Sequence, residues 1–85
     1  MSGETGLKIR VLFFGATADV AGTRAMQLEL PADASTGDAL ESLIDRYPAL
    51  ASHKLLYSIN QTYAKGDERL KDEDELAVFT AVSGG

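Results

Sequence analysis

A single stretch of this 85-residue chain has the periodicity of a long helix, and strand-like stretches flank it on both sides. Ser35, with Asp38 three residues later, forms the pattern of a capping box at its start, and Pro48 ends it. The apolar residues that recur at helical spacing are Leu40, Leu43, Ile44 and Tyr47. Because one helix covers only one face of a sheet of several strands, the other face must be wetter.

Strand patterns account for most of the remaining chain. The expected strands are 7–14, 25–31, 55–59, a short one around Tyr63, and a last one from 75 or 76 to about 82. Apolar residues alternate in 7–14, where Lys8 and Arg10 mark the face turned away from the helix. A helical turn over 16–21, stopped by Gly22, separates the first two strands. The last strand is expected to point Leu76, Val78 and Val82 inward.

The element order is β-β-α-β-(β)-β, and a last strand paired beside the first makes this the β-grasp arrangement. We therefore predict an α+β fold, a mixed sheet of four or five strands packed on one main helix. The length allows one domain, which we place at 7–82. Residues 1–6 and 83–85 are expected to form flexible tails.

Alternation also places two phenylalanines on the face that the helix does not cover. Phe14 in the first strand and Phe79 in the last would lie close together if those strands are neighbours, with Tyr63 as a third member. Single exposed apolar residues need no special explanation. Three aromatics clustered beside a chain end instead favour a partner interface.

Composition excludes several classes of function. The net charge of −5 argues against a nucleic-acid or anionic-membrane partner, and the absence of cysteine excludes disulfides, thiolate metal sites and a cysteine nucleophile. There is no apolar run long enough to span a membrane. The opening MSGETG lacks a signal-peptide pattern, so a cytosolic location is expected.

The side chains offer little catalytic chemistry. His53 is the only histidine and lies in a polar stretch, and Ser83 has no histidine near it in sequence. Six acids between 67 and 75 lack the spacing of a calcium loop and are expected to form a solvated turn or a negative patch that steers a basic partner. We expect no bound metal or cofactor.

One reactive group remains, the carboxylate of Gly85. Because Gly84 and Gly85 have no Cβ atoms, they can enter a slot too narrow for any other residue. A carboxylate is a poor electrophile, but its acyl-adenylate has AMP as a leaving group and can react with a sulfur or amine nucleophile. Taken alone, a Gly-Gly ending still favours an ordinary inert terminus.

Four segments together resemble the MoaD family, the small subunit of molybdopterin synthase. They are KIRVLFFG at 8–15 followed by VAG at 20–22, SINQTY at 58–63, DEDELAVF at 72–79, and VSGG at 82–85. The similarity extends from Leu7 to Gly85 in family order. It implies a β-grasp sulfur carrier that binds no cofactor itself.

In that family a MoeB-like E1 enzyme uses ATP to adenylate the terminal glycine, and a persulfide donor converts it to a thiocarboxylate. The tail then enters a MoaE-like large subunit, which carries the catalytic groups, and delivers sulfur to cyclic pyranopterin monophosphate within a heterotetramer. By this resemblance Gly85 would carry the sulfur and Gly84 would permit entry. The residues that would contact the partner are Phe14, Tyr63, Phe79, Val82 and Ser83.

Two features depart from the family pattern: Phe79-Thr80-Ala81 replaces a proline-containing stretch, and Glu73 stands where glycine is frequent. Three other functions stay open. The chain could carry sulfur for thiazole or thiolated-tRNA synthesis, it could be a ubiquitin-like modifier joined to lysine through Gly85, or it could be a binding module with an inert tail.

Overall fold

The computed structural model describes residues 6–80. The elements are β1 Gly6–Phe13, α1 Ala16–Ala21, β2 Ala25–Pro31, α2 Thr36–Arg46, the 3₁₀ helix η1 Pro48–Ser52, β3 Leu55–Ile59, β4 Thr62–Tyr63 and β5 Glu75–Thr80. Every expected strand and both expected helices are present, and β1 starts and ends one residue earlier than the predicted 7–14, so Phe14 follows the strand.

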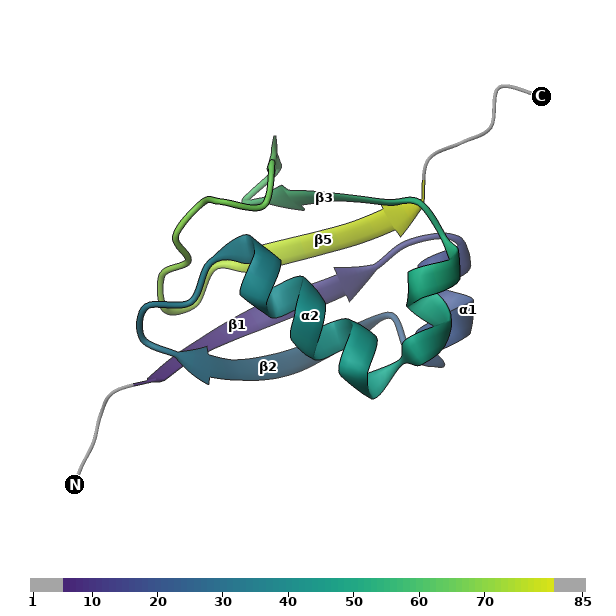
Figure 1. The fold of residues 1–85 in the computed structure, drawn as a ribbon, viewed down its shortest axis with the longest axis horizontal. Coiled ribbons are helices and arrows are strands. Elements are labelled where there is room, and N and C mark those ends of the chain that lie inside the picture. The colour runs from purple at the N-terminus through teal and green to yellow at the C-terminus, as the bar shows by residue number, and fades with distance from the viewer. Residues whose placement is uncertain (1–5, 81–85) are drawn as a thin grey trace.

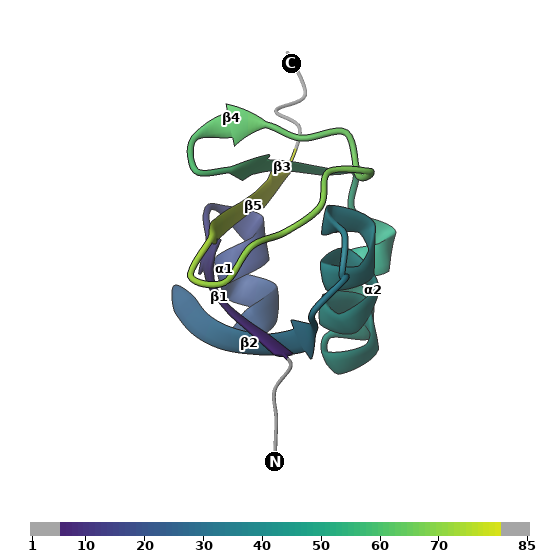
Figure 2. The same cartoon turned by 90° about the vertical axis from the view of Figure 1, so that its left-hand side faces the viewer.

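The five strands form one mixed sheet in the order β2-β1-β5-β3-β4. β1 runs parallel to β5, and the other strand pairs are antiparallel. The predicted pairing of the last strand with the first is therefore confirmed. α2 crosses one face of the sheet, whereas the opposite face has no long helix over it (Figures 1 and 2). The α+β β-grasp prediction is confirmed.

The core lies between the sheet and α2. The odd-numbered residues of β1 are buried, as alternation predicts, and Leu43 supplies the centre of the helix face. The core residues are Leu7, Ile9, Val11, Phe13, Leu28, Leu30, Ala34, Ala39, Leu43, Leu50, Leu70, Leu76 and Val78. Val78 and Leu76 in β5 face inward as expected, while Val82 lies outside the described residues.

Local signals fix the ends of α2. The Ser35 hydroxyl accepts a hydrogen bond from the Asp38 N–H, and the Asp38 carboxylate accepts one from the Ser35 N–H, so the predicted capping box is complete. The chain then continues into η1 rather than a loop. Leu50 in η1 is fully buried and adds to the core, while His53 follows η1 and stays partly exposed.

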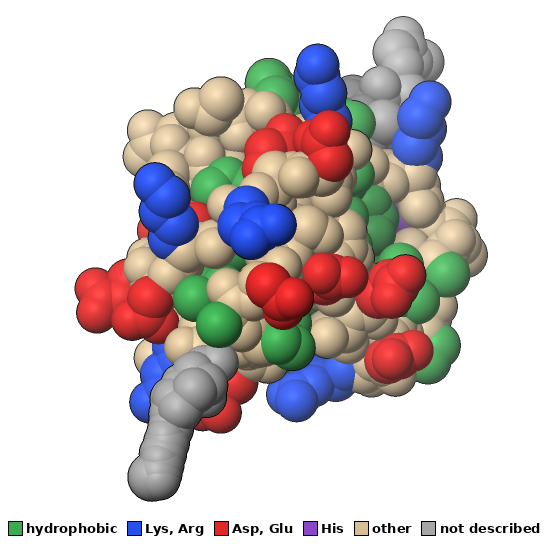
Figure 3. Space-filling model, turned by 60° about the vertical axis from the view of Figure 1, so that its left-hand side comes forward, with side chains coloured by type: hydrophobic (Ala, Val, Ile, Leu, Met, Phe, Trp, Pro, Cys, Tyr) green, Lys and Arg blue, Asp and Glu red, His purple; other side chains and the backbone are tan. Residues whose placement is uncertain are grey.

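No helix within residues 6–80 is long and apolar enough to cross a membrane. The same part of the chain contains no group of three or more His, Asp or Glu residues placed to hold a metal ion. The face drawn in Figure 3 carries both acidic and basic side chains, and a row of neighbouring acidic side chains runs from its middle to its right-hand side.

Candidate partner interface

Three aromatic side chains form the most exposed apolar feature of the sheet face opposite α2. We call Phe14, Tyr63 and Phe79 the aromatic patch. Phe14 is 51% exposed and Tyr63 74% exposed, whereas Phe79 is partly buried. The rings of Tyr63 and Phe79 pack edge to face, with their centroids 6.0 Å apart. The structure thus brings together Tyr63 and Phe79, as the sequence predicted.

Strand register places Phe14 at the end of the sheet where β5 stops, the end that also carries Phe79. Phe13 and Val78 form the last pair of the parallel β1–β5 register, and Phe14 and Phe79 are the residues that follow them in the chain. The Phe14 N–H donates to the Val78 carbonyl oxygen at 3.0 Å. Outward-facing Leu12 lies opposite Ala77, which extends the apolar surface along both strands.

A buried threonine holds the backbone of Phe14. The Thr17 side chain is completely buried, and its hydroxyl accepts a hydrogen bond from the Phe14 N–H. The same hydroxyl lies 2.7 Å from the Phe14 carbonyl oxygen and 2.9 Å from that of Val78, to which it donates. α1 therefore secures the end of β1 against β5, which fixes the exposed Phe14 ring above a rigid base. Sequence reasoning did not identify Thr17.

A tight turn places Tyr63. Asn60 and Gln61 have φ angles of 49° and 73°, the left-handed conformations of a two-residue hairpin turn between β3 and β4. The Asn60 amide group also donates to the Asp74 carboxylate at 2.9 Å and accepts from the Glu75 N–H at 3.0 Å. The segment around Asn60 thus ties the hairpin to the start of β5 and aligns Tyr63 with Phe79.

Three of the six acids between residues 67 and 75 accept hydrogen bonds that hold the fold. Asp72 accepts the Lys8 N–H, and Asp74 accepts the Lys71 N–H in addition to the amide of Asn60. Glu68 accepts the backbone N–H groups of Lys65 and Gly66, and these bonds lower the pKa of its carboxyl. Asp67, Asp72 and Glu73 are exposed, as expected of a solvated turn, and three of the six carboxylates also bind backbone donors.

The family departure at Glu73 has a conformational explanation. Glu73 has a φ of 69°, a region that glycine occupies without steric cost and that other residues avoid. Its N–H donates to the Lys8 carbonyl oxygen at 2.7 Å, so the turn is held against β1 despite this strain. Glycine would suit this position for backbone reasons alone.

The comparisons with known proteins point to one family. The ThiS family matches residues 11–85 of the chain. The chain belongs to the ThiS family. This ThiS-family chain is 42% identical, over 82 residues, to the molybdopterin synthase sulfur carrier subunit of Escherichia coli (strain K12), with 91% of this chain and 99% of that protein covered. It is 36% identical over 83 residues to the protein of the same name from Chlamydomonas reinhardtii, with 93% and 100% covered.

Among solved structures, this ThiS-family chain resembles the crystal structure of small archaeal modifier protein 1 (SAMP1) from Haloferax volcanii. The TM-score is 0.82 at 32% sequence identity, and the match covers 92% of this chain and 99% of that one. The other residues predicted for the site, Val82, Ser83, Gly84 and Gly85, lie outside the described residues. Their roles, and those of the aromatic patch, remain predictions.

Proposed function

We propose that this chain is the sulfur carrier subunit of a molybdopterin synthase, with Gly85 carrying sulfur as a thiocarboxylate. The observation that carries the proposal is its full-length similarity to two proteins of that name. The exposed aromatic patch supports it, because an aromatic, weakly charged surface at the end of β5 is suited to a protein partner. We place the chain in the cytosol as part of the same proposal.

The proposed chemistry resides in the Gly85 carboxyl carbon. A carboxylate oxygen attacks the α-phosphorus of ATP on a MoeB-like activating enzyme, and pyrophosphate leaves. The terminal sulfur of a persulfide then attacks the acyl carbon and AMP leaves. A second thiol cleaves the resulting acyl disulfide, releasing the thiocarboxylate. No side chain of this chain needs to transfer a proton in these steps, because the reacting atom is the terminal carboxyl carbon and the other reactants belong to partner proteins.

Delivery requires a second protein. We propose that the aromatic patch binds a MoaE-like large subunit in a heterotetramer, so that Gly84 and Gly85 enter its active site and the thiocarboxylate donates sulfur to cyclic pyranopterin monophosphate. The large subunit supplies the catalytic groups, and ATP is used by the activating enzyme only. Val82 and Ser83 form the part of the tail that contacts the partner.

Intact-mass spectrometry tests the carrier function. After incubation with the activating enzyme, ATP and a sulfur source, we expect the chain to gain the mass difference between one sulfur and one oxygen atom. A chain extended by one alanine after Gly85 is the matched control and should stay unchanged. An unmodified wild-type chain, under conditions in which a known carrier is charged, would refute the proposal. If the charged chain transferred its sulfur to thiazole or tRNA instead of the pterin, the chain would be a sulfur carrier of another pathway.

A second candidate function is protein modification. The similarity to SAMP1, whose name describes a modifier, is the specific observation that favours it. In that function an acceptor lysine amine attacks the Gly85 acyl-adenylate and forms an isopeptide bond as AMP leaves. We would then expect adducts that survive denaturation and that disappear when Gly85 is deleted. A cell extract without such adducts would exclude this function.

A further inference from the structure

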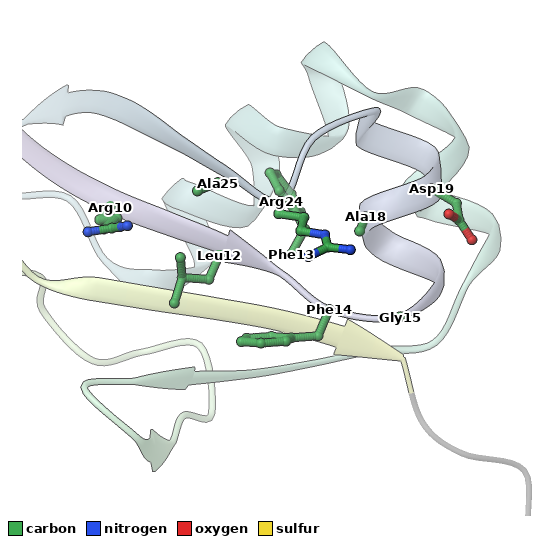
Figure 4. A pocket seen from close by; sticks show the side chains of 9 residues that line it. All are labelled: Arg10, Leu12, Phe13, Phe14, Gly15, Ala18, Asp19, Arg24 and Ala25. Atoms are coloured by element: carbon green, nitrogen blue, oxygen red, sulfur yellow. The ribbon is translucent and has the colours of Figure 1, made fainter.

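A hollow beside the aromatic patch combines an apolar surface with two arginines. It has a volume of about 580 Å³ and opens to solvent between β1, the start of β2 and α1 (Figure 4). Its lining includes Leu12, Phe14, Ala18 and Ala25, together with Arg10 and Arg24. Phe14 belongs both to the aromatic patch and to this hollow, so the two surfaces are continuous.

The charge of the hollow is opposite to that of the whole chain. The lining contains two arginines, Arg10 and Arg24, and one acid, Asp19, whereas the whole chain has a net charge of −5. In Figure 4 the Asp19 carboxylate lies on the outer side of α1, away from the Arg24 guanidinium. Within residues 6–80, neither guanidinium takes part in any side-chain hydrogen bond.

The two arginines differ in their surroundings. Arg10 lies opposite Glu75 in the β1–β5 register, so an acid of this chain already lies nearby. Arg24 lies in the turn between α1 and β2, and its guanidinium extends toward α1 and the end of β1. Arg24 is thus the principal cation of the hollow. Its planar guanidinium is suited to binding a carboxylate through two hydrogen bonds.

We infer that the hollow receives a segment of the large subunit in which an aspartate or glutamate adjoins an apolar side chain. The carboxylate pairs with Arg24, with Arg10 as the second cation, and the apolar side chain packs on Leu12 and Ala25. This inference rests on the proposed function, because it identifies the partner with the large subunit. It adds to the aromatic patch a polar contact that fixes the orientation of the two subunits.

Charge reversal tests the inference. Calorimetric titration of the large subunit into the Arg24→Glu variant should show affinity weaker by roughly tenfold or more, the effect of losing a charge-assisted bond. Arg46→Glu, on the exposed end of α2, produces the same change of net charge and is the control that should bind as wild type. Equal affinities for the two variants would overturn the inference.

Cross-linking identifies the occupant and does not depend on the charge variant folding. The chain has no cysteine, so Arg24→Cys accepts one photo-cross-linker at a single site. We expect cross-linking to a peptide of the large subunit that contains an acid, and an Asp or Glu to Lys change there should restore binding to Arg24→Glu. Cross-linking to a peptide without an acid, or none, would overturn the inference. Gly85 would still exchange oxygen for sulfur in that case, whereas failure of that exchange refutes the proposed function.

Discussion

The parallel pair β1–β5 has two very different ends. At the end where β5 begins, Asp72 and Asp74 accept backbone hydrogen bonds, and Asn60 links the hairpin to the strand. At the end where β5 stops, Phe14 is half exposed and Arg24 makes no recorded side-chain hydrogen bond within the described residues. One end uses its polar side chains to hold the fold, and the other leaves apolar and cationic groups available to a partner.

The largest effect is expected at the exposed end. Phe79→Asp should abolish stable association with the large subunit, because it places an unpaired charge at the centre of the contact. We expect affinity to fall by at least roughly 30-fold, while the circular dichroism spectrum stays that of the wild type. Phe79→Leu, which keeps an apolar side chain, should bind much better. Co-elution of Phe79→Asp with the large subunit would show that the aromatic patch is not the interface.

The end where β5 begins should respond more strongly in stability than in binding, because Asn60 reaches the aromatic patch only indirectly, through the hairpin that carries Tyr63. Asn60→Ala removes two hydrogen bonds and leaves an alanine in a left-handed conformation, so the free energy of unfolding should fall by about 1–3 kcal/mol. Asn60→Gly keeps the backbone conformation and should lose less. Urea denaturation measures both changes. If Asn60→Ala reduced the free energy of binding to the partner by more than it reduced the free energy of unfolding, the contrast between the two ends would be wrong.

A substitution at Glu73, next to the Asp74 that binds Asn60, is expected to raise stability. Glu73→Gly should raise the free energy of unfolding by about 1 kcal/mol, because glycine accepts the positive φ without steric cost. Glu73→Ala keeps the Cβ atom and the strain while removing the same charge. Thermal melts of the two variants separate the loss of backbone strain from the loss of the Glu73 charge. If only the alanine variant had a higher melting temperature than the wild type, the change in stability would come from the charge.

The smallest expected effect is the pH dependence of stability that comes from Glu68. Its pKa is lowered below the ordinary value of 4.5 by hydrogen bonds from the N–H groups of Lys65 and Gly66. The stabilisation is therefore fully present above that ordinary value and is lost as the pH falls through the lowered pKa. The stability difference between wild type and Glu68→Gln should narrow in that acidic range. A difference independent of pH would mean that the carboxylate charge is not involved.

Much of the candidate interface could be predicted from alternation. Phe14 and Phe79 follow from a period of two in segments whose other face is apolar, whereas Tyr63 is predicted only as a third aromatic near them, without use of the Asn60-Gln61 turn that positions it. Thr17 could not be found in this way, since its hydroxyl contacts Val78, 61 positions away along the chain. Arg24 carried no signal either, because its importance depends on what the neighbouring elements leave open around it.

The sequence by itself determined the elements and their faces, because capping, turn conformation and alternation depend on residues only a few positions apart. Only the tertiary structure decided which ends of the strands meet. The parallel pairing of β1 with β5 and the packing of α1 bring Phe14 to the end of β5, where its N–H bonds to Val78, and they shape the hollow at Arg24. These contacts join segments distant in the chain, and their geometry follows from packing the whole core at once.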